Sequence, residues 1–295
     1  MRLALVCGYN TALGEVTLFK SLKGLLGMGG NDPPDAAPPA DVLARAEAGD
    51  AEAANEVGLW YSENQPSSRK VEFWFRRAAD AGLPRAQHNM GVLRFQSGQT
   101  DDAIGWFRLA VAGGWRNSHV ALGSLLEEQG DRKGAFAAFE SGAQQGCPDA
   151  QDAIGRLALE YETEESFKVA RYWSEKAAEQ GNAEAQTRMG TIFHEGLGVA
   201  RDPERAMWWF LQAAKQNHAG AQAMIGVASH LGIGVEADRF HAVRMLMLSA
   251  AQGNQLAKAY LPTVFDELTP EERLLLEEWM DRVSPERKAA KKDDA

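Results

Sequence analysis

The sequence predicts an all-α protein, a right-handed α-solenoid of helix-turn-helix repeats that ends in a capping helix. Glycine recurs near the middle of one predicted helix per repeat, at intervals of 32 to 36 residues, and a closing Gly or Asn keeps the same interval. A fixed period in the thirties is typical of helical hairpins that stack side by side. The mid-helix glycines are Gly58, Gly91, Gly123, Gly155, Gly190 and Gly226.

The repeat at residues 182–217 shows both of its helices most clearly. Apolar side chains in its first half occupy the i, i+4, i+7 and i+8 positions of one helical face, and its second half carries a similar pattern. The first face consists of Ala185, Met189, Ile192 and Phe193, and the second of Ala206, Trp209, Phe210, Ala213 and Ala214. Each repeat therefore holds two amphipathic helices.

The segment between these two helices carries the residues of a tight turn. Gly196 and Gly198 permit the positive φ that ends the first helix. Asp202 supplies an N-cap oxygen, and Pro203 suits the first position of the second helix. Gly190 lies inside the first helix, where glycine costs roughly 1 kcal/mol relative to alanine. Its recurrence predicts that another backbone lies too close for a Cβ.

The other repeats follow the same order, and their lengths vary only in the turn. The predicted repeats are residues 50–82, 83–114, 115–146, 147–181, 182–217 and 218–253. Residues 1–40 hold a leader and a Pro/Gly-rich linker that we predict to be flexible, ahead of the array at 41–253. Residues 254–283 are predicted to form C-terminal capping helices, and 284–295 a solvated tail.

The predicted cap combines a partial repeat with one further helix. Residues 254–261 resemble the first helix of another repeat, which we expect Pro262 to cut short. Thr269 and Glu272 form a predicted capping box, with Pro270 at the first helical position. The apolar stripe that follows is expected to cover the last repeat, and it consists of Leu275, Leu276, Trp279, Met280 and Val283.

Residues 16–27 carry a second apolar stripe, outside the array. Leu18, Phe19, Leu22, Leu25 and Leu26 share one face of a helix in this segment. One interpretation is a helix that binds a membrane surface or a partner. The others are a disordered leader or a helix packed on the first repeat. A start of translation at Val16, which would remove residues 1–15, stays open.

The motif order of the repeats resembles a known family. The order is Ala-x-Ala-x-x-x-apolar-Gly, then Gly-x-Gly-Val-x-x-Asp, then Ala-x-x-Trp-aromatic-x-x-Ala-Ala, then Gly. It is similar to that of the Sel-one-like repeat (SLR) family, a subgroup of the TPR-like α-solenoids. The resemblance covers residues 50–253 and is looser in the first four repeats, whose turns lack Gly-x-Gly. It implies a protein that holds other proteins together, often in bacterial signalling or envelope processes, without shared catalytic residues.

Composition narrows the classes of partner and compartment. A formal net charge of −10 argues against nucleic-acid binding, which requires a basic surface. Cys7 and Cys147 are too few for a disulfide framework, and the apolar start of the chain is short for a signal peptide. The sequence therefore predicts a cytoplasmic protein. A periplasmic or membrane-associated location, reached through the N-terminal residues, is the alternative.

Several residues mimic chemical motifs without completing them. His194 and Glu195 begin a zinc motif, but Gly198 stands where the second histidine is required. The paired turn glycines follow predicted helices rather than strands, which argues against a dinucleotide loop. The sequence thus predicts no catalytic residues, no metal, no cofactor and no small-molecule substrate. An enzyme such as a hydrolase is the least favoured class.

Tryptophan recurs at one position of the second helix. Trp74, Trp106, Trp173 and Trp209 each lie four residues before the small pair that ends this helix. The remaining two repeats place Ala138 and Leu246 at the same position, by the same count. A position that accepts Trp, Leu and Ala is expected to be a packing position in the core rather than a platform for ligands.

The candidate binding surface consists of first-helix residues that point away from the second helix. Relative to each mid-helix glycine, these residues lie at positions −3, +1 and +4. We expect them to form the concave face of the solenoid. The predicted partner-binding residues are Asn55, His88, Ser124, Asp152, Arg156, Thr187, Thr191, His194 and His230. Their mixed character favours a protein or peptide partner and thus a non-enzymatic scaffold. The alternative for the surface is an ordinary solvated face without a partner. The alternative for the function is an envelope-associated regulatory protein.

Overall fold

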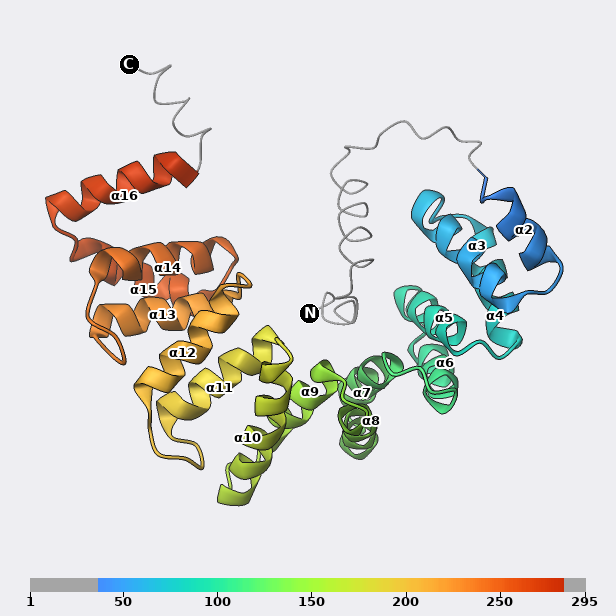
Figure 1. The fold of residues 1–295 in the computed structure, drawn as a ribbon, viewed down its shortest axis with the longest axis horizontal. Coiled ribbons are helices and arrows are strands. Elements are labelled where there is room, and N and C mark those ends of the chain that lie inside the picture. The colour runs from blue at the N-terminus through green and yellow to red at the C-terminus, as the bar shows by residue number, and fades with distance from the viewer. Residues whose placement is uncertain (1–36, 284–295) are drawn as a thin grey trace, which may run out of the picture. The chain divides into compact units, whose positions relative to one another are not determined.

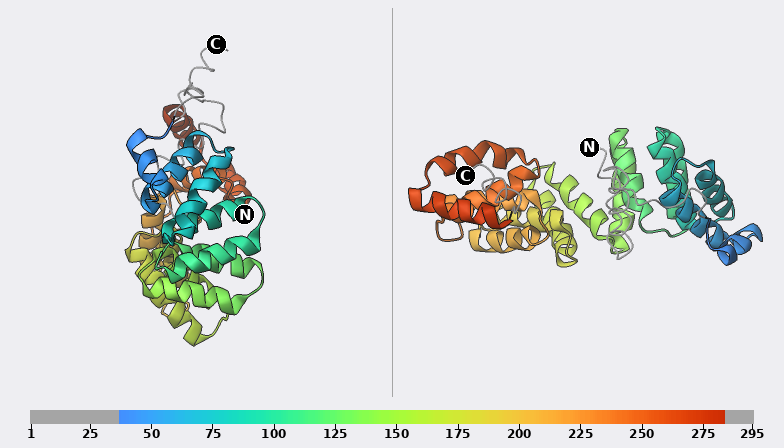
Figure 2. Two further views of the ribbon diagram at one scale, coloured as in Figure 1. Left: turned by 90° about the vertical axis from the view of Figure 1, so that its right-hand side faces the viewer. Right: turned by 90° about the horizontal axis from the view of Figure 1, so that it is seen from above.

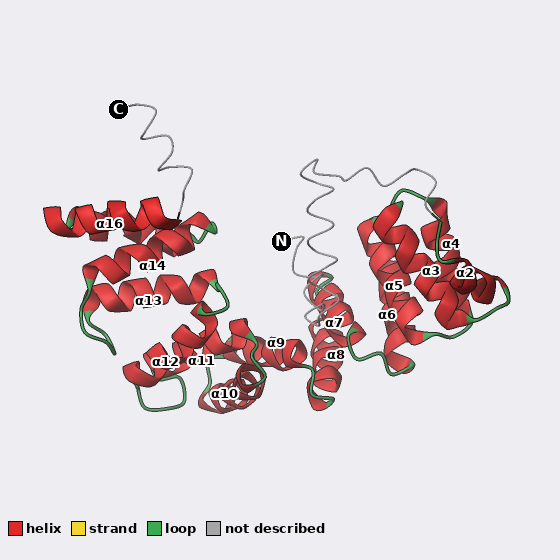
Figure 3. Ribbon diagram, turned by 45° about the horizontal axis from the view of Figure 1, so that its top comes forward, coloured by secondary structure: helices red, strands yellow, loops and turns green. Residues whose placement is uncertain are grey.

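The computed structural model describes residues 37–283, and there it consists of fifteen α-helices without a strand (Figures 1 and 3). The predicted all-α fold is confirmed. The helices form two compact units, one ending at Ala153 and one beginning at Ile154, and α9 (Pro148–Leu159) contains the division. None of the helices between residues 37 and 283 is both long and apolar enough to cross a membrane. The predicted segment 16–27 and tail 284–295 lie outside the described residues.

The N-terminal unit consists of one short helix followed by helical hairpins. Its helices before α9 are α2 (Ala40–Glu47), α3 (Ala51–Asn64), α4 (Arg69–Asp80), α5 (Pro84–Gln96), α6 (Thr100–Ala112), α7 (Ser118–Glu128) and α8 (Arg132–Gln144). The pairs α3–α4, α5–α6 and α7–α8 pack together as hairpins, and each second helix also packs on the hairpin that follows within the unit.

The C-terminal unit also consists of alternating first and second helices, which run from yellow-green to red in Figure 2. Its helices after α9 are α10 (Glu164–Glu179), α11 (Ala183–Glu195), α12 (Pro203–Ala214), α13 (Ala219–Leu231), α14 (Arg239–Ala251), α15 (Gln255–Asp266) and α16 (Pro270–Val283). Helices α11 and α12 pack together as a hairpin, as do α13 and α14, and α14 packs on α15.

The predicted turn between α11 and α12 is confirmed in detail. Gly196 ends α11 in the left-handed region with φ +78°. Asp202 Oδ1 accepts a hydrogen bond from the backbone N–H of Arg205 at 2.9 Å, and Pro203 begins α12. Since the N-cap oxygen satisfies one of the free N–H groups of the first turn, the sequence defines where α12 starts.

The mid-helix glycines make the predicted close approach, and the nearest neighbour of each is a side chain of the second helix. A Cβ added to Gly58, Gly91, Gly123 or Gly190 would lie 2.5 or 2.6 Å from a phenylalanine ring of the second helix. The four rings belong to Phe75, Phe107, Phe139 and Phe210. Leu246 takes this place against Gly226, and the Ser174 hydroxyl takes it against Gly155. The predicted backbone contact is therefore wrong for the four glycines that face a ring, because the ring fills the space of the Cβ. At Gly226 and Gly155 the carbonyl oxygens of Ala242 and Ala170 also lie 3.1 and 3.3 Å from the added Cβ.

This contact also corrects the alignment of the last full repeat. Leu246 was aligned with the tryptophan position, but it opposes Gly226 as Phe210 opposes Gly190. Met245, partly buried, therefore takes the tryptophan position, and the small pair that ends α14 begins at the buried Ser249. Among the four tryptophans, Trp74 is 6% exposed, and Trp106, Trp173 and Trp209 are partly buried.

The C-terminal helices differ from expectation in two respects. Pro262 lies inside α15, which continues to Asp266, so the predicted end at Pro262 is wrong. The cost of an internal proline is offset because Val264, 0% exposed, packs in the cluster that holds Leu246 and Leu276. The predicted capping box of α16 is present, since Thr269 N–H donates to Glu272 Oε2 at 2.8 Å. Leu275, expected in the buried stripe, is 47% exposed.

We expect Gly190→Leu to lower the free energy of unfolding by about 2–3 kcal/mol, because its side chain would overlap the Phe210 ring. Gly105→Leu is the matched control, since nothing lies within 4 Å of a Cβ at this helical glycine. Urea denaturation followed by circular dichroism measures both variants. Equal midpoints for the two variants would show that the ring contact does not constrain position 190.

We expect Leu276→Asp to destabilise the protein by roughly 3–4 kcal/mol, because it places a carboxylate in the apolar cluster under α16. Leu275→Asp alters the neighbouring side chain, which is already 47% exposed, and should change stability by less than about 0.5 kcal/mol. Thermal melting and light scattering compare the two variants. Identical melting curves would contradict a capping role for Leu276.

Candidate partner-binding surface

Three of the six residues that lie three positions before a mid-helix glycine, Asn55, His88 and Thr187, connect neighbouring repeats. Asn89 Nδ2 donates to Asn55 Oδ1 at 2.8 Å, and His88 Nδ1 lies 2.9 Å from Ser118 Oγ. Asn55 is 1% exposed and His88 is 7% exposed. The prediction that Asn55 and His88 contact a partner is therefore corrected, because the adjacent repeat covers both side chains.

His88 is kept neutral by its surroundings. Its ring centroid lies 5.3 Å from that of Phe107, and burial lowers the pKa of His88 to about 4. A neutral imidazole has one donor and one acceptor nitrogen, so the ring can pair with the Ser118 hydroxyl without a charge. His88 thus acts in packing between repeats.

Thr187 takes part in a similar connection in the C-terminal unit. His218 is the N-cap of α13, and its Nδ1 accepts from the Ala221 N–H at 3.2 Å and lies 2.9 Å from Thr187 Oγ1. The other ring nitrogen, Nε2, lies 3.0 Å from Glu184 Oε1, and this hydrogen bond is the main cause that lowers the pKa of Glu184. Thr187 is therefore only partly available to a partner.

The remaining predicted residues are partly exposed. Ser124 lies on α7, while Asp152 and Arg156 lie on α9, where Arg156 Nη1 is 3.3 Å from Glu160 Oε1. Thr191 and His194 lie one turn apart on α11, on its surface. Thr191 Oγ1 donates to the Thr187 carbonyl at 3.2 Å.

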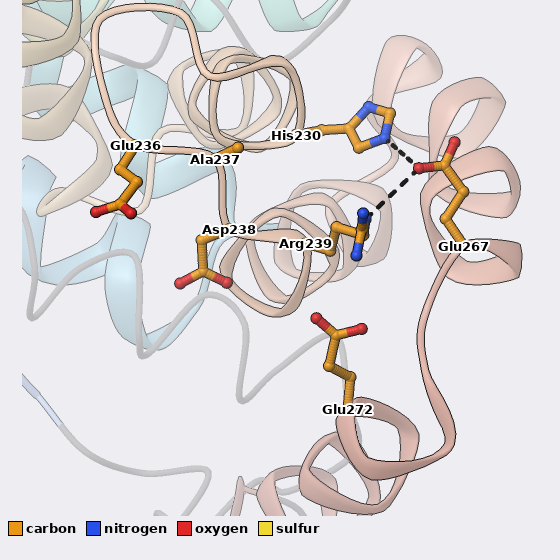
Figure 4. A pocket seen from close by; sticks show the side chains of 7 residues that line it. All are labelled: His230, Glu236, Ala237, Asp238, Arg239, Glu267 and Glu272. Carbon is orange, nitrogen blue, oxygen red and sulfur yellow. Dashed lines mark hydrogen bonds and ion pairs between the residues drawn. The ribbon is translucent and has the colours of Figure 1, made fainter.

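His230, in the last turn of α13, belongs to a hydrogen-bonded chain (Figure 4). Its Nε2 lies 2.9 Å from Glu267 Oε2, and its Nδ1 lies 2.7 Å from the Tyr260 hydroxyl. An ionised carboxylate can only accept, so the Nε2–H of His230 donates to Glu267. Arg239 Nε lies 3.8 Å from the same Glu267 oxygen. The chain links α13, α14 and α15 to the residue that follows α15.

The charges along this chain shift two pKa values in opposite directions. The hydrogen bond from His230, together with the charge of Arg239, lowers the pKa of Glu267. Burial raises the pKa of Tyr260, and the charge of Glu267 adds to this effect. The His230 side chain is only 11% exposed, so it offers an edge rather than a whole ring to a partner.

A hollow of roughly 580 Å³ lies beside His230 (Figure 4). It is bordered by the α13–α14 turn, the start of α14 and the segment from Glu267 to Glu272. Its lining residues are His230, Glu236, Ala237, Asp238, Arg239, Glu267 and Glu272. Asp238 and Glu272 also cap helices through their carboxylates. Four carboxylates and one guanidinium give the hollow a negative balance, which disfavours phosphorylated and other anionic ligands.

The part of the chain between residues 37 and 283 does not bring together three or more His, Cys, Asp or Glu side chains that could hold a metal ion. Cys147 is a buried free thiol, and its burial raises its pKa, which disfavours the reactive thiolate.

A recurrent glutamine was missed in the sequence. It lies four residues before the mid-helix glycine, at positions 87, 151, 186 and 222. Gln151 Nε2 and Gln186 Nε2 each donate, at 3.1 Å, to a carbonyl at the end of the preceding second helix. Gln186 Oε1 also accepts from Gln216 in its own repeat at 2.9 Å. The fixed offset from glycine was the available signal.

We expect protonation of His88 to make stability depend on pH. The pKa of His88 is lowered in the folded state to about 4, so its contribution is complete above pH ~6.5 and falls as the pH drops toward 4. Between pH 7.5 and 5.0 this amounts to about 2 kcal/mol. Denaturant unfolding at both pH values should show this difference in the wild type and a smaller one in His88→Gln. An unchanged difference in the variant would assign the dependence to other groups.

The family comparison identifies the repeat. The Sel1 repeat model matches residues 72–83, 84–115, 148–182, 183–218 and 219–254, together just over half of the chain. The uncharacterised protein NMB1327 of Neisseria meningitidis serogroup B is 29% identical over 147 residues, which cover 48% of this chain and 31% of that protein. The chain therefore spans about a third of the length of this curated relative.

Solved structures show the same fold. The protective antigen c5321 of uropathogenic Escherichia coli, which has an SLR fold, matches with TM-score 0.75 and 23% identity over 85% of this chain and 58% of that chain. A Sel1 repeat protein of Oxalobacter formigenes gives 0.59 and 22%, over 81% and 96%. The APC/C hetero-tetramer Cut9-Hcn1 gives 0.50 and 14%, over 85% and 52%. With its repeating hairpins and the matched repeats, this chain belongs to the Sel1 repeat family of α-solenoid proteins.

Proposed function

We propose that this protein is a non-enzymatic scaffold that binds a partner protein or peptide on the first-helix surface of its C-terminal unit. Sel1 and related TPR-like repeats generally serve as protein–protein interaction scaffolds. The proposed surface consists of Thr191 and His194 on α11, Val227 on α13 and the exposed edge of His230.

One observation carries this proposal. Thr191 and Val227, like His194 and His230, occupy equivalent positions in successive repeats and are partly exposed. Three residues before the glycines, in contrast, Asn55, His88 and Thr187 make contacts between repeats. Regular packing thus leaves a row of partly exposed side chains on helices that the neighbouring repeats hold in place, which supports their contact with a ligand.

The chemistry of this row supports a peptide or helical partner. A threonine hydroxyl, an imidazole and an apolar valine can together contact an amphipathic segment. The hollow beside His230 contributes the carboxylates of Glu236, Asp238 and Glu272. These charges favour neutral or basic side chains of the partner at this end of the surface and disfavour phosphorylated ones.

The test compares two matched double variants of the full chain. Thr191→Ala/His194→Ala alters α11 at the proposed surface, whereas Gln212→Ala/Lys215→Ala alters the partly exposed Gln212 near the end of α12 and the exposed Lys215 that follows this helix. We expect the first pair to reduce recovery of crosslinked partners from cells at least tenfold, since few residues carry most interface energy. The second pair should recover them as the wild type does. Circular dichroism confirms that both variants fold. Loss of recovery in the α12 pair alone would contradict the proposal.

A further inference from the structure

We propose that the start of α14 and the hollow beside His230 form a docking site for a turn of the partner protein, one that contains glycine and carries a lysine or arginine side chain. The inference rests on the proposed scaffold function and adds to it the kind of segment that the partner supplies. It is carried by the way in which turns pack between successive repeats of the C-terminal unit, and by the charges around the hollow.

In the C-terminal unit, the turn of one repeat packs on the second helix of the repeat before it. A Cβ added to Gly198, in the α11–α12 turn, would lie 2.8 Å from the Phe167 Cβ on α10. A Cβ added to Gly234, in the α13–α14 turn, would lie 3.1 Å from the Pro203 Cβ on α12. The two glycines have φ values of +66° and +71°, in the left-handed region. The contact therefore requires a turn that carries no side chain at this point.

The two contacts use equivalent positions of the second helix. Phe167 and Pro203 each lie seven residues before the side chain that opposes the mid-helix glycine of their own repeat. The same count back from Leu246 leads to Arg239, the first residue of α14. The start of α14 is thus the third position in a row at which a following turn would pack.

The chain does not place a glycine turn at this third position. In the two preceding turns, the packed glycine lies eight residues after the mid-helix glycine. Pro262 stands 36 residues after Gly226, at the next mid-helix position, and Pro270, eight residues further, begins α16. The hollow of roughly 580 Å³ lies beside Arg239 instead (Figure 4). Its volume is within the range of about 300–1,000 Å³ that is typical of ligand pockets.

The charges around the hollow determine which turn it accepts. Glu236 is exposed, and Asp238 and Glu272 each use one carboxylate oxygen to accept from a backbone N–H as a helix cap. The second oxygen of each carboxylate can accept from a ligand. The guanidinium of Arg239 lies 3.8 Å from Glu267. A lysine or arginine of the partner would therefore meet complementary charge, whereas a phosphate or carboxylate would be repelled.

The hollow shares His230 with the proposed partner surface. A partner that contacts the first-helix residues of the C-terminal unit can therefore reach the hollow within the same unit. Its docked turn would repeat on α14 the contact that Gly234 makes on α12. In this arrangement the glycine permits close packing, and the basic side chain supplies the charge complementarity.

Peptide selection tests the predicted ligand directly. The immobilised full chain selects binders from a random 12-residue peptide library displayed on phage. The variant Ala237→Phe, which places a ring in the hollow, is used to remove peptides that bind elsewhere. We expect the recovered peptides to contain glycine, and lysine or arginine, at least three times as often as the library does. Recovery of no peptides, or of peptides without this enrichment, overturns the proposal.

Substitutions then locate the peptide on the protein. Fluorescence anisotropy measures the Kd of the most enriched peptide, and circular dichroism confirms that each variant folds. Glu236→Lys and Ala237→Phe should each raise the Kd at least tenfold. Glu179→Lys is the matched control, because Glu179 is exposed at the end of α10 and does not line the hollow, and it should change the Kd less than twofold. An equal rise in all three variants, or none, overturns the proposal.

Changes in the peptide separate its two predicted features. Replacing the basic residue with glutamine, or the glycine with alanine, should each raise the Kd at least fivefold, because the first removes the charge and the second disfavours the positive φ of the turn. If only the basic residue matters, the hollow binds a cationic side chain without a turn, and the turn-docking proposal is wrong.

Partner recovery from cells separates this proposal from the scaffold function. If Thr191→Ala/His194→Ala reduces recovery and Glu236→Lys does not, the proposed surface stands and the docking proposal is wrong. If Glu236→Lys reduces recovery and the α11 pair does not, the hollow binds the partner and the α11 surface is wrong. A wild-type dimer in light scattering that Ala237→Phe dissociates would show that a second copy supplies the turn, which overturns the assignment to a partner.

Discussion

The contact between a second-helix side chain and a mid-helix glycine is the constraint on which each hairpin depends. Without a Cβ at Gly190, the Phe210 ring occupies that space and brings α12 close to α11. The glycine lowers helix propensity, and burial of the ring offsets this cost. Where the ring is replaced, by Ser174 or Leu246, the glycine still faces a close side chain. The spacing of the two helices is therefore conserved by geometry rather than by one residue type.

Connections between hairpins are polar as well as apolar. The glutamines at positions 151 and 186 donate to carbonyls in the last turn of the preceding second helix, and these carbonyls also accept from the backbone N–H groups of Gly146 and Gly181. His88 and Thr187 connect to residues of the next repeat. Buried polar groups of this kind specify register, because a shifted repeat would leave them unsatisfied. The array thus combines a glycine contact within each hairpin with hydrogen bonds between hairpins.

These connections also determine which residues remain for function. Of the predicted surface row, Asn55 and His88 are buried between repeats, whereas Thr191 and His194 stay partly exposed. His230 lies between these extremes, since Tyr260 and Glu267 hold its ring and leave one edge beside the acidic hollow. Side chains that connect repeats and side chains that stay partly exposed are thus separated by as little as one helical turn, as Thr187 and Thr191 are on α11.

The sequence by itself determined the all-α fold, the hairpin repeat, and the caps at Asp202 and Thr269, because periodicity and capping act over a few residues. The sequence also predicted a close approach at Gly190, but it did not predict that the neighbour is the Phe210 ring. Only tertiary structure decided that α15 continues through Pro262, since burial of Val264 and its neighbours outweighs a local preference to stop. It also decided which first-helix residues face a neighbouring repeat, because helical spacing alone does not specify where the next hairpin lies.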